Sequence, residues 1–164
     1  SAYKEAADDA RTLAAAVDAL LASPSGDTLK AARKAWVEAR PAYLKTETFR
    51  FYDGPIEEVE GAINAWPMNE AYIDYVDGKA DAGLINDASF KVGLDDIEKS
   101  NQSKDEADVT TGWHAIEFLL WGQDLSADGP AAAKRTRLCE KAESHAGARG
   151  DWPHDEWHGH SGGL

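Results

Sequence analysis

Apolar residues recur at intervals of three and four along residues 2–22, which is the pattern of a helix with one buried face. The positions that form this stripe are Tyr3, Ala6, Ala10, Leu13, Val17 and Leu20. The sequence SPSGD at 23–27 then interrupts the pattern, and Asp27 or Thr28 can cap a second helix. We therefore predict two helices joined by a short turn.

A second apolar stripe follows the turn. It is formed by Leu29, Ala32, Trp36 and Tyr43. Pro41 lies within this pattern, and a proline removes a backbone hydrogen-bond donor from a helix. We therefore expect a kink or a break near Arg40.

The middle of the chain is dense in turn-forming residues. The sequence DGP at 53–55 marks a turn, and Trp66–Pro67 precedes a short helical run from about Asn69 to Val76. Residues 77–109 hold short amphipathic pieces, and SNQSKDEADVTTG at 100–112 is typical of a surface loop. No strand pattern of convincing length occurs, so the predicted fold class is all-α.

Residues 113–121 read WHAIEFLLW, which predicts a largely buried helix capped by Thr110 or Thr111 and ending near Gly122. His114 and Glu117 are three positions apart, so they share one face of this helix and can converge on a single ion. A buried carboxylate must be protonated, paired or metal-bound. The alternative is a buried histidine that is hydrogen-bonded by the neighbouring glutamate and binds nothing.

Composition narrows the classes of partner. The net charge of −13 would repel a phosphate backbone or an anionic membrane surface, so cations are more natural ligands than nucleic acid. No apolar stretch is long enough to be a transmembrane segment, and the opening SAYKEAADDA does not have the pattern of a signal peptide. Cys139 is the single cysteine, so it supplies neither an intrachain disulfide nor a cysteine metal site.

The amino-acid composition of the chain changes near its end. Residues 130–164 contain almost no branched aliphatic residues and hold four histidines, at 145, 154, 158 and 160. Such a segment cannot bury a helical stripe of its own. We therefore expect a helical domain over 1–129 and an atypical, poorly structured tail over 130–164, which resembles the product of a shifted reading frame or an artefact.

Two other acidic clusters are candidate sites. Glu47 lies in ETFRFYD beside Arg50, and Glu70 and Asp74 lie four apart in NAWPMNEAYIDY. The alternative for Glu47 and Arg50 is an ordinary ion pair on a helix surface. The alternative for Glu70 and Asp74 is a solvated acidic face, which an acidic protein forms easily.

Three separated blocks give the chain a family resemblance. The blocks are AARKAWVEARPAYLKTETFRFYDGPI at 31–56, INAWPMNEAYIDYV at 63–76 and TGWHAIEFLLWGQD at 111–124. In these blocks the chain resembles the imelysin-like family, which groups imelysin peptidases with bacterial iron-regulated proteins. The third block contains a sequence that resembles the family's G-x-H-x-x-E motif as Gly112, His114 and Glu117. The resemblance covers residues 1–130, ends after about Gly129, and corresponds to the amino-terminal half of a family member.

The resemblance implies an all-α fold of two helical bundles, of which this chain would form the first. It also implies a periplasmic or outer-membrane-anchored protein that is linked to iron or heme uptake, with possible contacts to other iron-uptake components. The implied metal ligands are His114 and Glu117, with Glu47 and Glu70 as candidate partners. Gly112 and Trp66 would support the motif, as would Asp74 more weakly.

Three functions stay open from the sequence. The first is a protein that binds a divalent cation, such as iron or zinc, or a heme-related ligand at the His-x-x-Glu motif. The second is a zinc metallopeptidase, in which Glu117 is the candidate catalytic residue; its weakness is that one histidine and one glutamate are fewer than the three protein ligands of a catalytic zinc. The third is a helical scaffold with a structural His–Glu pair.

Overall fold

The structure, a computed structural model, describes residues 1–52 and 55–123, and these residues form helices connected by turns and loops. The elements are α1 (Ala2–Ala22), α2 (Gly26–Glu47), the 3-10 turn η1 (Arg50–Tyr52), α3 (Pro55–Ile63), α4 (Glu70–Ile73), the 3-10 turn η2 (Leu84–Asn86), α5 (Leu94–Ser100) and α6 (Gly112–Trp121). The described part contains an isolated bridge of the β type between Val76 and Lys79. The predicted all-α class is confirmed, and the predicted tail over 130–164 lies outside the described residues.

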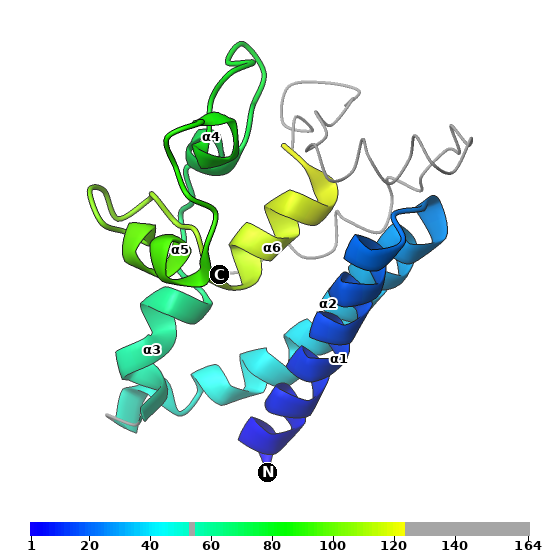
Figure 1. Cartoon of the computed structure of the whole chain (residues 1–164). Helices are drawn as coiled ribbons and strands as arrows, with labels where there is room; N and C mark the ends of the chain where they lie inside the picture. The colour runs from blue at the N-terminus through cyan, green and yellow to red at the C-terminus, as the bar shows by residue number, and fades with distance from the viewer. Residues whose placement is uncertain (53–54, 124–164) are drawn as a thin grey trace.

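Helices α1 and α2 form a hairpin and run side by side in Figure 1. Helix α1 has the predicted bounds. The predicted cap of α2 is wrong by two or three positions, because Ser25 is the N-cap and its side chain accepts from the backbone of Thr28. The backbone N–H of Ser25 in turn donates to the Thr28 hydroxyl, so the two residues form a capping box.

Pro41 does not break α2, which is helical from Gly26 to Glu47. Of the kink or break predicted near Arg40, the break is therefore wrong. The last turns of α2 lead away from α1 toward α3 in Figure 1. This path carries Arg40 and Glu47 from the helical hairpin to the neighbourhood of α3.

Helix α6 lies between two apolar clusters. Trp113 and Leu120 belong to the core shared with α1 and α2, where they join Leu20 and Leu29. Phe118 belongs to a second core on the other side of α6. The remaining buried members of that core are Ile73, Val76 and Ala115. Because two sides of this ten-residue helix are buried, its direction is fixed by packing from both sides.

Side chains of α2 also hold α6 through its backbone. The indole Nε1 of Trp36 donates to the carbonyl of Trp113 at 3.0 Å, and Nε of Arg33 donates to the carbonyl of Leu120 at 2.8 Å. The second contact satisfies one of the carbonyls that a helix leaves free at its C-terminus. As predicted, α6 begins after Thr111 and ends at Gly122.

The start of α6 touches the end of α3. Gly112 has a φ of +85°, and a Cβ at this position would lie 2.3 Å from the carbonyl oxygen of Ile63. The hydroxyl of Thr111 donates to the carbonyl of Ala62 at 2.9 Å. Glycine is therefore required at position 112 both by its backbone conformation and by the close approach of two backbones.

The segment between α3 and α6 differs from its prediction. The run expected from Asn69 to Val76 is helical only as α4, because Asp74 is already extended, with a φ of −145°. Glu70 and Asp74 therefore do not share a helix face. The segment expected to be a surface loop also has a buried part, since Val109 is fully buried and Asp108 is nearly so.

None of the helices in residues 1–52 and 55–123 combines the length and hydrophobicity needed to cross a membrane.

Replacing Gly112 by alanine should destabilise the fold strongly. The left-handed backbone conformation costs an alanine about 1–2 kcal/mol, and the clash with the Ile63 carbonyl adds about 1–3 kcal/mol. Gly78→Ala is the matched control, because Gly78 has a φ of +72° and no atom within 4 Å of the added Cβ. Urea unfolding followed by circular dichroism should show a clearly larger loss of unfolding free energy for Gly112→Ala; equal losses would contradict the close approach.

Candidate functional site

His114 and Glu117 form a hydrogen-bonded pair on α6. The distance between Nδ1 of His114 and Oε2 of Glu117 is 3.0 Å, and the two side chains are 17% and 22% exposed. The pair therefore lies neither in the core nor fully in solvent. The helical spacing alone brings the two groups together, as the sequence predicts.

The direction of this hydrogen bond follows from its chemistry. An ionised carboxylate only accepts, so Nδ1 of His114 must carry the hydrogen, and in a neutral imidazole Nε2 then has the free lone pair. In the described part, the one fully buried side-chain nitrogen or oxygen without a partner is Oη of Tyr43. The unpaired Nε2 of His114 is therefore within reach of solvent and of a ligand.

Trp66 covers one side of the imidazole. The ring centroids of Trp66 and His114 are 4.7 Å apart, with an angle of 51° between the planes. Trp66 itself is 67% exposed and lies in the segment that follows α3. Trp66 therefore forms an aromatic wall at the surface beside His114, and its role in supporting the motif stays a prediction.

Arg40 lies in a cage of aromatic rings and interacts electrostatically with Glu117. Its guanidinium carbon is 5.6 Å from the ring centre of Trp36, 5.5 Å from that of Tyr43 and 5.6 Å from that of Trp113. Burial lowers the pKa of Arg40, while the negative charges of Glu117 and Glu47 act in the opposite direction. An arginine keeps its charge in proteins, so a fixed cation stands close to the carboxylate of Glu117.

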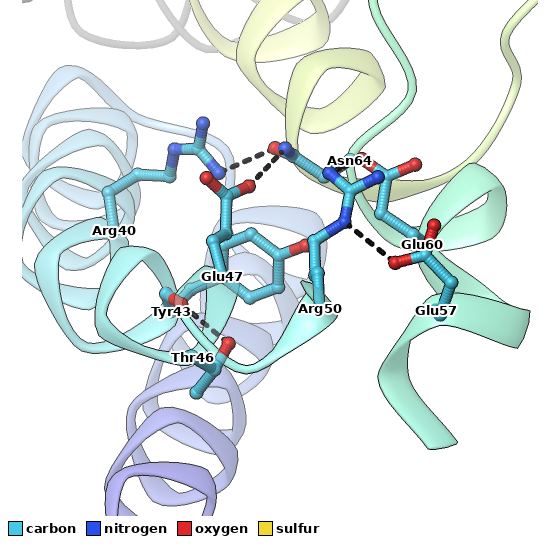
Figure 2. A network of polar contacts seen from close by, with 8 residues as sticks. All are labelled: Arg40, Tyr43, Thr46, Glu47, Arg50, Glu57, Glu60 and Asn64. Atoms are coloured by element: carbon cyan, nitrogen blue, oxygen red, sulfur yellow. Dashed lines mark hydrogen bonds and ion pairs between the residues drawn. The ribbon is translucent and has the colours of Figure 1, made fainter. Parts of the chain in front are cut away.

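A chain of hydrogen bonds links Arg40 to Glu47 (Figure 2). Nη1 of Arg40 donates to Oδ1 of Asn64 at 2.7 Å, and Nδ2 of Asn64 donates to Oε1 of Glu47 at 2.9 Å. Asn64 directly follows α3, while Arg40 and Glu47 come from α2. Arg40 therefore reaches Glu47 through Asn64, and its charge interacts with those of both Glu47 and Glu117.

Arg50 does not form the ion pair with Glu47 that the sequence leaves open as an alternative. It pairs instead with two carboxylates of α3, at 3.2 Å from Glu57 and 3.1 Å from Glu60. The hydrogen bond to Glu57 is the main cause that raises the pKa of Arg50. These contacts join α3 to the segment that follows α2.

Tyr43 is a buried phenol with no hydrogen-bond partner for its hydroxyl group. Burial raises its pKa to about 12, and the charges of Glu47 and Glu60 act in the same direction, against those of Arg40 and Arg50. The hydroxyl of Thr46 donates to the backbone carbonyl of Tyr43 at 2.6 Å. This hydrogen bond is to the backbone, so it does not satisfy the phenol. This phenol stays neutral well above the pH at which an exposed tyrosine ionises.

The expected four-residue ligand set does not assemble in the described part. Residues 1–52 and 55–123 contain no group of three or more His, Cys, Asp and Glu side chains that could hold a metal ion. Glu70 begins α4, and the buried carboxylate of Asp74 accepts from the backbone of Tyr75 and from Asn86. Only the pair of His114 and Glu117 is found together.

Two residues near this pair were missed by the sequence analysis, namely Arg40 and Asn64. A signal for Arg40 was available, because Trp36, Arg40 and Tyr43 follow one another at helical spacing on one side of α2. No comparable signal marks Asn64, whose role depends on how α3 approaches α2.

Comparison with known proteins relates the whole described part to one family. The family model described as Imelysin matches residues 1–149. This match continues past Gly129, so the expectation that the resemblance ends there is wrong. A curated relative from Synechococcus elongatus, named iron-regulated protein A, is 29% identical over 136 residues, which is 83% of this chain and 31% of the relative. The chain thus spans about a third of the length of that relative.

The high pKa of Tyr43 predicts a late step in an alkaline titration. Because the folded state keeps the phenol proton up to about pH 12 and the unfolded chain loses it near 10, this group leaves stability unchanged below about pH 10 and reduces it as the pH rises toward 12. Tyrosinate absorbance of the folded chain should contain a component near pH 12 that disappears in Tyr43→Phe.

The matched control is Tyr52→Phe, which removes a phenol that is 79% exposed and should leave the component near pH 12 in place. Loss of an ordinary component near pH 10 in Tyr43→Phe would show that the phenol is not buried as described.

Proposed function

The chain belongs to the imelysin family, and on this premise we propose that it is an iron-associated binding protein whose ligand is held at His114. The observation that carries the proposal is the hydrogen bond from Nδ1 of His114 to Glu117, which leaves Nε2 as a donor atom at the surface. Imidazole nitrogen is a suitable ligand for iron and zinc. In this proposal the metal is cargo that is bound and released, and it takes no part in a reaction.

The name of the curated relative supports the link to iron. That relative is called iron-regulated protein A, and it is about three times as long as the aligned part of this chain. We propose the same association for this chain, together with a periplasmic or surface location and contacts with other iron-uptake components. The net charge of −13 favours the approach of cationic species in general.

The alternative of a zinc peptidase has less support. A catalytic zinc uses three protein ligands and an open position, and the described part brings no group of three together. In addition, Glu117 is engaged by His114, so it is not free to act as a general base on a bound water. The family name alone therefore stands behind this alternative.

A purely structural His–Glu pair is the remaining alternative, and it differs from the proposal in one measurable respect. A structural pair needs no accessible donor atom, whereas a ligand site needs one. If the pair is purely structural, replacing it would change the stability of the fold and leave ligand binding unchanged.

The test uses a variant in which His114 is the only histidine. The chain has five histidines, and replacing His145, His154, His158 and His160 by asparagine leaves His114 as the only one. Iron(II), zinc(II) and iron(III) protoporphyrin are each titrated anaerobically and followed by calorimetry or absorbance. At least one of them should bind near one equivalent.

The matched variant adds His114→Ala to the same background. The affinity should fall by more than about 100-fold, since losing an outer-shell group alone costs about 10–100-fold. Circular dichroism checks that both proteins remain helical. If none of the three species binds, or if His114→Ala leaves binding unchanged in a folded protein, the proposed function is wrong.

A further inference from the structure

We propose that an open apolar cavity beside α1 binds an uncharged, mainly hydrocarbon molecule with one carbonyl oxygen, which accepts a hydrogen bond from Tyr43. The cavity has a volume of about 600 Å³ and is lined by residues of α1, α2, α3 and α6. A volume of several hundred Å³ with mostly apolar walls and few polar groups is typical of sites for small molecules. Neither His114 nor Glu117 lines the cavity, so this inference goes beyond the proposed function and does not depend on it.

Small side chains on α1 leave the space for this cavity. Ala7, Ala10 and Ala14 follow one another at helical spacing, so they share one face of α1, and all three are exposed and line the cavity. A methyl group fills little of the space beside a helix. Larger apolar side chains of α3 and α6 form another part of the wall, namely Ile56, Ile63 and Ile116. The walls therefore suit a hydrocarbon surface.

The cavity wall excludes anionic ligands. Asp18 is the one charged residue among the described residues that line it. A carboxylate or phosphate that entered the cavity would lose hydration without gaining a positive partner from these residues. The net charge of −13 adds a general repulsion of anions. The ligand that fits is therefore uncharged.

Tyr43 supplies the polar group of the site. The residue is 4% exposed and lines the cavity, and its hydroxyl oxygen is buried without a hydrogen-bond partner among the described residues. Because burial raises the pKa of Tyr43 to about 12, the hydroxyl keeps its hydrogen and can donate it. Buried polar groups in proteins are nearly always hydrogen-bonded. An unsatisfied phenol in a residue of the cavity wall therefore requires an acceptor, which a ligand oxygen supplies.

Two other occupants fit the unsatisfied phenol less well. A buried water molecule needs about two to four polar partners, and the hydroxyl of Thr46, which also lines the cavity, already donates to the backbone of Tyr43. An amphipathic helix of another protein would present apolar side chains, and its backbone carbonyls are bonded within the helix. A carbonyl oxygen on an otherwise apolar molecule satisfies the phenol and the apolar walls together.

The experiment titrates the full chain with three fluorescent probes of similar shape that carry their substituent at the same ring position. Acetylpyrene has a carbonyl oxygen, ethylpyrene is the hydrocarbon without it, and pyrenecarboxylate is the anion. We expect both neutral probes to bind near one equivalent and the anion to bind more weakly than either. If neither neutral probe binds, or if the anion binds as tightly as they do, the inference is wrong.

Tyr43→Phe isolates the hydrogen bond, because it removes only the hydroxyl group. The affinity for acetylpyrene should fall about 3–10-fold, and the affinity for ethylpyrene should stay the same. Tyr52→Phe is the control, since Tyr52 is 79% exposed and does not line the cavity, and it should change neither affinity. An equal effect of Tyr43→Phe on the two neutral probes would show that the phenol does not donate to the ligand.

Ala10→Leu tests the place of binding, because the larger side chain fills the cavity while leucine remains a good helix former. The affinity for both neutral probes should fall by more than about tenfold. Ala15→Leu is the control, since Ala15 is an exposed residue of α1 that does not line the cavity.

Circular dichroism checks that both alanine variants remain helical. Unchanged binding in a folded Ala10→Leu variant would overturn the inference. It also fails if sedimentation shows that the parent chain is a dimer and that Ala10→Leu dissociates it, because the cavity would then be an interface between two copies of the chain.

Discussion

The position of α6 is the constraint on which the rest of the structure depends. Its first residue, Gly112, lies against the carbonyl of Ile63 so closely that no Cβ fits. Its backbone also accepts hydrogen bonds from Trp36 and Arg33 of α2. Because apolar clusters bury two sides of the helix, His114 and Glu117 occupy the side that is left between them. A short helix held at both ends can keep a donor atom in place without support from a metal.

The arrangement around Glu117 decides what the pair can do. A carboxylate with one neighbouring imidazole could serve as a metal ligand, but here the positive charge of Arg40 also interacts with it. The aromatic cage and the link through Asn64 to Glu47 keep that charge in place. The charged groups of the site therefore compensate one another, and the free lone pair on His114 is the part that remains for a ligand.

The sequence predicted what depends on local pattern. The bounds of α1, the existence and end of α6, and the closeness of His114 to Glu117 follow from helical spacing and capping chemistry, and they are confirmed. Pro41 was expected to kink or break α2, and the helix does not break there. The short extent of α4 was also missed, because Asp74 takes its hydrogen bonds from Tyr75 and Asn86 rather than from a helix.

Features that depend on tertiary packing could not be read from the sequence. The role of Arg40 requires the rings of two helices and the approach of Asn64 from a third segment. In the described part Glu70 does not complete a group of three ligands with the pair, which depends on the path of the chain after Trp66–Pro67 that no local pattern specifies. Ligand sets gathered from separate sequence blocks are for this reason the least secure kind of prediction.

The central claim is that Glu117 holds the hydrogen on Nδ1 of His114 and leaves Nε2 free. Nitrogen-15 NMR of the ring measures this directly in the variant whose only histidine is His114. The account predicts a single neutral imidazole with its hydrogen on Nδ1 near neutral pH, and a loss of that preference in Glu117→Gln. A ring that carries its hydrogen on Nε2 would contradict it, because no lone pair would then face the ligand.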